Sequence, residues 1–164
     1  MIKVLEKMRI GHGFDVHQLG AGRLLVLGGE TIEHPLGLLG HSDADVVIHA
    51  LCDAILGAIG LGDIGKHFPD TSDEFKGIDS RRLLRSVTQK MHQEGYELGN
   101  ADLTIVAQEP KLAPYIPRMI SNLASDLRAS EQQINIKATT TERLGFVGQE
   151  QGMAAHAVVL LTSI

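Results

Sequence analysis

The stretch Met153-Ala154-Ala155-His156-Ala157-Val158-Val159-Leu160-Leu161 decides the fold of this 164-residue chain. Eight of its nine residues are apolar, which is typical of a strand whose sheet is covered on both sides. Successive side chains of a strand point to opposite faces, so Val158 and Leu160 share one face and the residues between them share the other. Helices cover one of these faces, and association between copies of the chain is the simplest cover for the other.

The remaining elements follow from apolar spacing, caps and prolines. The predicted helices span residues 42–60, 80–94 and 114–127, and the predicted strands span residues 8–16, 23–27, 102–108, 133–138 and 153–161. Gly28-Gly29 predicts a turn and residues 36–40 predict a loop. This order predicts an α+β fold, an α/β sandwich with one mainly four-stranded sheet and three helices on one face. We expect a single domain over residues 8–164, after an N-terminal extension over residues 1–7.

The composition excludes several classes of protein. The formal charge is −5, from 15 basic and 20 acidic residues, with no tryptophan and no basic run, so nucleic-acid binding is not expected. No apolar run approaches the roughly 20 residues that a helix needs to cross a bilayer, so no membrane segment is expected. The single cysteine, Cys52, excludes an intrachain disulfide and suits a reducing cytoplasm.

Three residues form a candidate metal site. Asp15 and His17 are two positions apart in a predicted strand, so they project from the same face. With His49 from the first predicted helix, they would leave an open fourth position on a tetrahedral Zn²⁺, as catalytic sites do. Two alternatives stay open: a non-haem Fe(II) oxygenase uses the same ligand types, and His49 alone is equally consistent with a hydrogen-bonded structural residue.

The start of the first helix offers further chemistry. His41, Asp45 and His49 fall four residues apart, so on a helix they share one face and Asp45 could orient the ring of His49. His41 and Ser42 at the helix N-terminus suit a phosphate group. Alternatively, Ser42 or Asp43 is only the N-cap and His41 is an exposed loop residue.

Two loops and a strand end are further candidates. Residues 62–71 predict a long glycine-rich loop, and its Asp63 and Asp70 could accept hydrogen bonds from a sugar. Alternatively, this segment is only a mobile surface loop. Residues 107–112 predict a turn whose backbone could bind a base edge, with Lys111 on a phosphate. Alternatively, this segment is a surface turn with a solvated Lys111. Residues 137–142 carry three threonines and Glu142, which suit phosphate oxygens and Mg²⁺, although threonine also favours strands in general.

Taken together, these motifs resemble the 2-C-methyl-D-erythritol 2,4-cyclodiphosphate synthase family of the non-mevalonate isoprenoid pathway. The motifs that carry the resemblance are residues 11–17 (GHGFDVH), 41–45 (HSDAD), 62–65 (GDIG), 68–71 (FPDT), 137–142 (KATTTE) and 144–146 (LGF). They occur in order over nearly all of residues 8–161. The resemblance implies a homotrimer with sheets facing the central axis and active sites between subunits, which supplies the missing cover for the sheet.

The resemblance also implies roles for particular residues. Asp15, His17 and His49 would hold Zn²⁺ or another divalent transition metal, and Glu142 would hold Mg²⁺ or Mn²⁺ together with the substrate diphosphate. His41 and Thr140 would stabilise the transition state. The implied substrate-binding residues are Asp15, His17, His41, Ser42, Asp63, Ile64, Gly65, Phe68, Pro69, Asp70, Thr71, Ser72, Ala107, Lys111, Leu112, Ala113, Thr139, Thr140, Thr141, Glu142, Phe146 and Gln149.

The implied reaction is the cyclisation of 4-diphosphocytidyl-2-C-methyl-D-erythritol 2-phosphate, with release of CMP. The 2-phosphate would attack the metal-polarised β-phosphate, a step that needs positioning and charge screening more than a base. One position departs from the family pattern: Gln149 stands where an arginine is common, which puts in doubt an anionic isoprenoid ligand near the trimer axis. A metal- or nucleotide-binding trimer without turnover is the non-enzymatic alternative.

Overall fold

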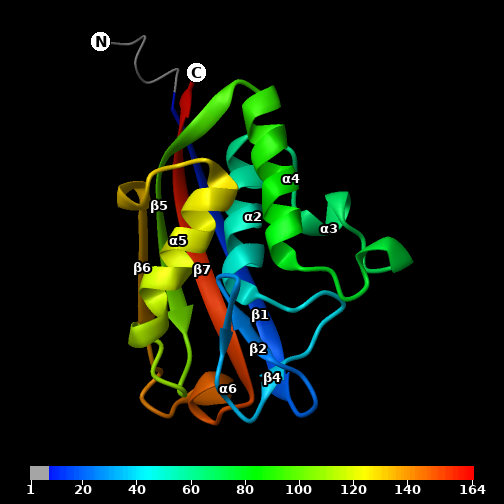
Figure 1. Cartoon of the computed structure of the whole chain (residues 1–164), viewed down its shortest axis with the longest axis vertical. Coiled ribbons are helices and arrows are strands. Elements are labelled where there is room, and N and C mark those ends of the chain that lie inside the picture. The colour runs from blue at the N-terminus through cyan, green and yellow to red at the C-terminus, as the bar shows by residue number, and fades with distance from the viewer. Residues whose placement is uncertain (1–7) are drawn as a thin grey trace.

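A five-stranded sheet forms the centre of the protein, as seen in a computed structural model that describes residues 8–164 (Figure 1). The extension expected over residues 1–7 lies outside the described residues. Across the sheet the strands run β4 (Gly37–Leu38), β1 (Met8–Gly20), β7 (Gly152–Ser163), β5 (Tyr96–Val106) and β6 (Ile134–Thr139). Strand β7 pairs antiparallel with β1 and β5, and β5 pairs parallel with β6.

The fifth strand corrects the four-stranded prediction. Strand β1 continues to Gly20, beyond the predicted end at residue 16, and its last two residues pair with Gly37 and Leu38. Residues 36–40 were expected to be a loop because two glycines interrupt them, but tertiary pairing overrides that local preference. Strands β2 (Leu25–Leu27) and β3 (Glu30–Ile32) form a separate hairpin. Its turn is Gly28-Gly29, as predicted, and both residues have positive φ.

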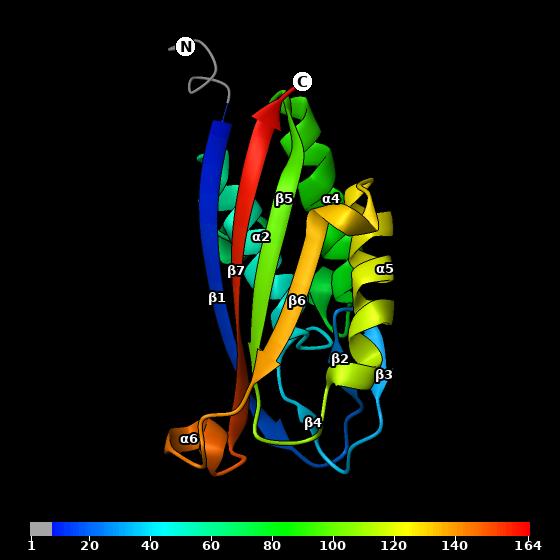
Figure 2. The same cartoon turned by 90° about the vertical axis from the view of Figure 1, so that its left-hand side faces the viewer.

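Three long helices cover one face of the sheet, as Figure 2 shows. They are α2 (Val46–Ala58), α4 (Ser80–Gln93) and α5 (Ile116–Leu127), and the short helices are α3 (Ile64–His67) and α6 (Gly145–Gly148). Single 3₁₀ turns occur at Asp73–Phe75, Ala113–Tyr115 and Glu131–Gln133. No helix within residues 8–164 is long and apolar enough to cross a membrane. The opposite face of the sheet exposes large apolar side chains, among them Ile10, Phe14 and Val158.

Two glycines of β1 set the distance between α2 and the sheet. A Cβ atom at Gly11 would lie 1.8 Å from the carbonyl oxygen of Ala54, and one at Gly13 would lie 1.8 Å from that of Ala50. Helix α2 therefore lies directly on the β1 backbone. Because side chains alternate along a strand, the same face of β1 next presents Asp15, and this brings it against the helix that carries His49.

Candidate metal and substrate site

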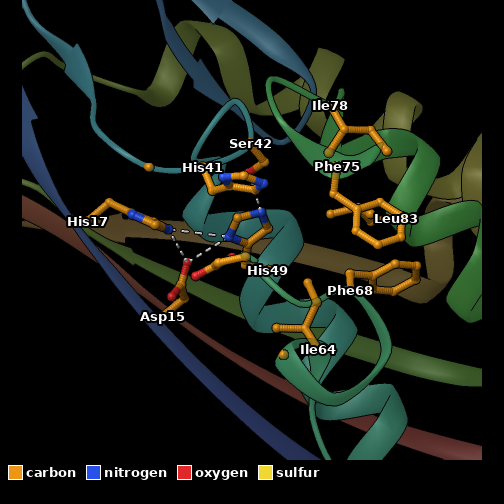
Figure 3. A pocket seen from close by; sticks show the side chains of 13 residues that line it. Asp15, His17, His41, Ser42, His49, Ile64, Phe68, Phe75, Ile78 and Leu83 are labelled. Carbon is orange, nitrogen blue, oxygen red and sulfur yellow. Dashed lines mark hydrogen bonds and ion pairs between the residues drawn. The ribbon is translucent and has the colours of Figure 1, made fainter. Parts of the chain in front are cut away.

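Asp15, His17 and His49 meet at the contact between β1 and α2. Oδ2 of Asp15 lies 3.1 Å from Nε2 of His17 and 3.1 Å from Nδ1 of His49, and the two ring nitrogens are 3.4 Å apart. Figure 3 shows the three side chains pointing toward one another. Among the described residues they form the one cluster of three or more such side chains whose ligand atoms all lie within 4.8 Å of one another.

These separations fit a single divalent cation. Zinc–nitrogen and zinc–oxygen bonds of about 2.1 Å place neighbouring ligands of a tetrahedral ion roughly 3.4 Å apart. Two imidazole nitrogens and one carboxylate oxygen are also a donor set that suits a transition metal. The site therefore fits a metal ion with one coordination position left for a further ligand.

Hydrogen bonds on the far side of each ring fix the nitrogen that faces the cluster. Nδ1 of His17 lies 2.8 Å from the carbonyl oxygen of Leu39, which requires a proton on Nδ1 and leaves Nε2 as the ligand atom. Nε2 of His49 lies 2.9 Å from the hydroxyl of Ser80 and 3.1 Å from that of Ser42. The Ser80 hydroxyl in turn donates to Asp43, so it accepts from Nε2–H of His49 and leaves Nδ1 free.

The role expected for Asp45 is wrong. Helix α2 begins at Val46, so Asp45 is its N-cap, and its carboxylate accepts hydrogen bonds from the backbone N–H groups of Val47 and Ile48. It also accepts from the N–H groups of Gly28 and Gly29 and so fastens the β2–β3 hairpin to the helix. The spacing argument failed because the helix starts later than Ser42 or Asp43, and residues 41 and 45 do not share a helical face with His49.

The carboxylate and the imidazoles stabilise one another electrostatically. Burial opposes the charged form of Asp15, but hydrogen bonds from His17 and His49 outweigh it and lower the pKa of Asp15 to about 2. Burial likewise opposes the charged form of His17, yet the hydrogen bond and negative charge of Asp15 raise the pKa of His17 above its usual value. Asp15 therefore stays ionised near neutral pH, as a metal ligand must.

A cavity of about 240 Å³ opens beside the cluster. Its predicted lining residues are Asp15, His17, His41, Ser42, His49, Ile64, Gly65, Phe68 and Asp70. The cavity also has an apolar wall of Phe75, Ile78 and Leu83, which was not predicted (Figure 3). Gly40 was not predicted either. The polar loop before α4 shows no apolar periodicity that would indicate a buried surface. Phe75 and Ile78 are nevertheless large apolar residues of a kind that a solvated loop rarely carries.

The loop after α2 forms the facing side of this cavity. Asp63, expected to accept from a sugar, caps α3 and accepts from Lys66 N–H at 2.9 Å. Ile64 N–H donates to the carboxylate of Asp53 at 2.7 Å. Asp53 lies in α2, one helical turn after His49. Pro69, Thr71 and Ser72 lie in the same loop but do not line the cavity. The Ser72 carbonyl oxygen lies 3.0 Å from Nε2 of His41 and fixes that ring.

Arg23 is a further residue that sequence reasoning missed. Its guanidinium donates to the carbonyl oxygen of Gly40 at 2.6 Å and to that of Ser42. It therefore grips the backbone on both sides of His41 and places a fixed positive charge near the cavity. No motif indicated this contact, because Arg23 lies in the connection before β2.

A second cavity, of about 230 Å³, lies at the other edge of the sheet. Its lining includes the predicted residues Ala107, Lys111, Leu112, Ala113, Thr139 and Thr140, together with Gln108, Pro110 and Ala138. These residues follow β5 and end β6, so the parallel pairing of the two strands brings them together. The two segments, which were separate candidates in the sequence, thus line one cavity.

The turn after β6 is held in an unusual conformation. Glu142 and Arg143 both have positive φ, 52° and 64°, which is rare for residues other than glycine. Glu142 N–H donates to the Thr140 hydroxyl, and the Thr141 hydroxyl donates to the carbonyl oxygen of Leu144. Strain of this kind persists where surrounding contacts hold it and is common at ligand sites.

A third and wider hollow, of about 610 Å³, lies between the end of β1 and helix α6. Phe146 lines it together with His17 and Glu150, whereas the predicted Gln149 does not. Gln149 is the C-cap of α6, and its side chain oxygen accepts from Gln151. The hollow adjoins the metal cluster through His17.

The two predicted catalytic residues lie in different cavities. Thr139 pairs with Val106, which pairs with Ala154, which pairs with Val16 between Asp15 and His17. Three interstrand spacings separate the ends of this row, roughly 14 Å of backbone. His41 therefore lies on the β1 side of the sheet, and Thr140 lies beyond its β6 edge.

The chain matches one protein family over nearly its whole length. The sequence model of the YgbB family matches residues 8–162. The chain belongs to the YgbB family. A 2-C-methyl-D-erythritol 2,4-cyclodiphosphate synthase from Geobacter metallireducens is 65% identical to it, over 94% of this chain and 98% of the relative. One from Geobacter sulfurreducens is 62% identical, with the same coverage. This member of the YgbB family is accordingly an enzyme, a lyase of isoprenoid precursor biosynthesis.

Solved structures agree with the family assignment. A structure described as Plasmodium falciparum IspF in a CDP complex superposes with a TM-score of 0.84 at 34% identity, covering 96% of this chain and 97% of that one. The bifunctional IspDF of Campylobacter jejuni superposes with a TM-score of 0.93 at 47% identity. The match covers 96% of this chain but only 43% of that longer protein. Non-haem Fe(II) oxygenases with these ligand types usually have a double-stranded β architecture, and the mixed fold of residues 8–164 differs from it.

Proposed function

We propose that this chain converts 4-diphosphocytidyl-2-C-methyl-D-erythritol 2-phosphate into 2-C-methyl-D-erythritol 2,4-cyclodiphosphate and CMP. The observation that carries the proposal is the Asp15, His17 and His49 cluster, which opens into a cavity shared with His41 and Ser42. The chain has this cluster within a sequence 65% identical to a curated synthase.

The donor atoms support two kinds of metal ion. Asp15, His17 and His49 would hold Zn²⁺ or another divalent transition metal, and Glu142 offers a carboxylate to Mg²⁺ or Mn²⁺ bound with the substrate diphosphate. Bound there, such ions polarise phosphate oxygens and neutralise the charge that develops on departing CMP.

The residues around the first cavity would hold the phosphate arm of the substrate. His41 is fixed by the Ser72 carbonyl through Nε2, so its Nδ1 is the atom left for substrate. The apolar wall of Phe75, Ile78 and Leu83 suits the methyl-bearing carbon chain and would exclude water from it.

The chemical step then needs positioning rather than a strong base. An oxygen of the 2-phosphate, already anionic, forms a bond to the β-phosphorus, and the bond from that phosphorus to the bridging oxygen breaks and leaves CMP with the electron pair. Both groups belong to one substrate, so holding them in line makes the reaction intramolecular. Thr140 and Lys111 at the second cavity would hold the diphosphate, and residues 107–113 the cytosine.

A homotrimer with active sites between subunits would bring the two half-sites together. The metal half belongs to the β1 side of the sheet and the nucleotide half to the β6 edge, so a neighbouring copy can complete each site. The exposed apolar side chains Ile10, Phe14 and Val158 support burial of the uncovered sheet face toward the central axis. We propose a cytoplasmic location as well, in keeping with the buried free thiol of Cys52.

The test is ³¹P NMR of the protein with this substrate and Mg²⁺, before and after chelation. Chelator-sensitive appearance of CMP together with the cyclic diphosphate is the expected result. Free phosphate, or CMP without the cyclic product, would instead identify a hydrolase. No turnover by protein with metal bound would favour the binding-protein alternative.

A further inference from the structure

Two histidines meet on the face of the sheet that the helices leave uncovered. Nε2 of His12, on β1, lies 3.2 Å from Nδ1 of His156, on β7. Both side chains are exposed, and neither lines the cavities of the metal and nucleotide half-sites. The proposed reaction gives this pair no role.

The strands hold the pair in a rigid arrangement. His156 pairs directly with Phe14 of β1, so His12 is its diagonal neighbour on the same face, within an antiparallel ladder that runs from Met8 to Gln18. The ring of Phe14 packs on that of His156, with centroids 4.9 Å apart and planes inclined at 50°. The ring of His156 is therefore braced by an aromatic neighbour, and its backbone is paired on both sides, with β1 and with β5. The backbone of His12 is paired on one side, with β7.

The separation of the two nitrogens suits a shared cation. With metal–nitrogen bonds of about 2.1 Å, nitrogens 3.2 Å apart subtend roughly 100° at the metal, between the tetrahedral and octahedral values. Without an ion, the same separation allows only one proton between the rings, as an N–H···N hydrogen bond. Asp102, a partly exposed carboxylate on the adjacent strand β5, is engaged in an ion pair with Lys137 at 2.6 Å. The ligand set is thus two imidazole nitrogens without a carboxylate.

We propose that His12 and His156 form a second metal site, which binds a divalent first-row transition ion through two imidazole nitrogens. Imidazole ligands without a carboxylate select Cu²⁺, Ni²⁺ and Zn²⁺ over Mg²⁺ and Ca²⁺, and Cu²⁺ binds most tightly. Water completes the coordination of an ion on a single chain. Sharing of one ion between copies is a further possibility that rests on the trimer of the proposed function.

Copper binding to the whole protein tests the proposal. Bound Cu²⁺ is counted by equilibrium dialysis for the wild type, His156→Gln and His12→Gln, and nitrogen splitting is read from the copper EPR spectrum. Glutamine keeps a polar side chain at an exposed position but supplies no imidazole. His34→Ala is the matched control, because it removes a histidine outside both sites.

Each glutamine variant is expected to bind one Cu²⁺ fewer per chain than the wild type, or one fewer per three chains where copies share the ion. The lost EPR component should show two nitrogens per copper where each chain holds its own ion, and more than two where copies share it. His34→Ala should bind as the wild type does. Equal copper counts in the wild type and in both glutamine variants would overturn the proposal. This outcome is independent of turnover, so it leaves the proposed reaction untouched.

Discussion

The hydroxyl of Ser80 lies 2.9 Å from Nε2 of His49, and the two residues are 31 positions apart in the chain. Because Ser80 donates to Asp43, it must accept the proton of His49, and this leaves Nδ1 for the metal. Ser80→Ala is therefore expected to weaken Zn²⁺ binding about 10- to 100-fold, the usual effect of losing such a partner. Competition with a chromophoric chelator measures this affinity.

A control for this variant lies on the same helix. Thr88 is also buried in α4, but its hydroxyl donates to the Leu84 carbonyl and lies away from the cluster. Thr88→Val should leave zinc affinity unchanged. Equal affinities for Ser80→Ala and the wild type would show that Ser42 alone orients His49.

Two glycine-to-alanine substitutions should have opposite effects on stability. Gly13→Ala would place Cβ 1.8 Å from the Ala50 carbonyl oxygen and force α2 off the sheet. We expect a loss at or above the upper end of the usual overpacking cost of about 1–3 kcal/mol. In contrast, Gly57 lies in α2, and beyond its chain neighbours and the adjacent helix backbone no atom lies within 4 Å of its Cβ position. Gly57→Ala should therefore stabilise by about 0.5–1 kcal/mol. Urea unfolding of both variants checks the prediction, and a stable Gly13→Ala protein would contradict the close packing of α2 on β1.

Local sequence rules predicted the parts of the protein that depend on local spacing. The alternation of a strand placed Asp15 and His17 on one face, and the structure has both at the cluster. Asp79 caps α4, which runs over Ser80–Gln93 and ends one residue before the predicted limit. A strand is recognised by its two-residue period and a helix by its 3.6-residue period and its cap. These signals are visible within one segment of the chain.

Features that depend on distant segments were missed or wrong. Asp45 was assigned to His49 by helical spacing, but it caps α2 and also binds the N–H groups of the β2–β3 turn. No pattern within residues 41–49 indicates the contact with that turn. The contacts of Ser80 with His49 and of Arg23 with Ser42 depend on how loops pack, and so does the apolar wall that includes Phe75. Chain spacing carries no information about such contacts.

Metal affinity should fall as the pH is lowered. The Asp15 charge raises the pKa of His17, so the folded protein without metal holds a proton on His17 at pH values where a free histidine would have lost it. That proton stabilises the fold below about pH 6.5, and the contribution is lost as the pH rises through the raised pKa. Below that pKa a metal must displace the proton, so affinity should fall at least about tenfold per pH unit. Zinc titrations between pH 5 and 8 should show this slope, and a flat profile would contradict it.

Asp53 should act as a positioning residue for the cavity loop. Burial raises the pKa of its carboxyl, and its oxygen accepts from Ile64 N–H at the start of α3. Asp53→Ala leaves that donor without a partner, so the loop opens and KM should rise about tenfold, while kcat changes little. Asp53→Asn keeps an acceptor and should restore most of the affinity. Glu33→Ala, an exposed acid elsewhere, is the control, and an equal fall in kcat for both Asp53 variants would assign Asp53 to the chemical step instead.

Sharing of active sites between copies predicts complementation of inactive variants. His49→Ala lacks a metal ligand and Thr140→Ala lacks a group at the second cavity, so each pure protein should lose nearly all turnover. When the two are unfolded together and refolded as mixed trimers, the metal half of a Thr140→Ala chain can meet the nucleotide half of a His49→Ala chain. With random assembly about one quarter of the sites have both halves intact, so about a quarter of wild-type activity should return.

The mixture distinguishes shared sites from sites within one chain. If each chain held a complete site, every site in the mixture would carry one of the two substitutions and no activity could return. Refolding each variant alone is the control, because it shows whether refolding itself restores turnover. If activity returns in the mixture but in neither variant refolded alone, residues on the β1 side of one chain's sheet and at the β6 edge of another chain's sheet must act on one substrate. An inactive mixture of well-folded trimers would place both halves of the site on the same chain.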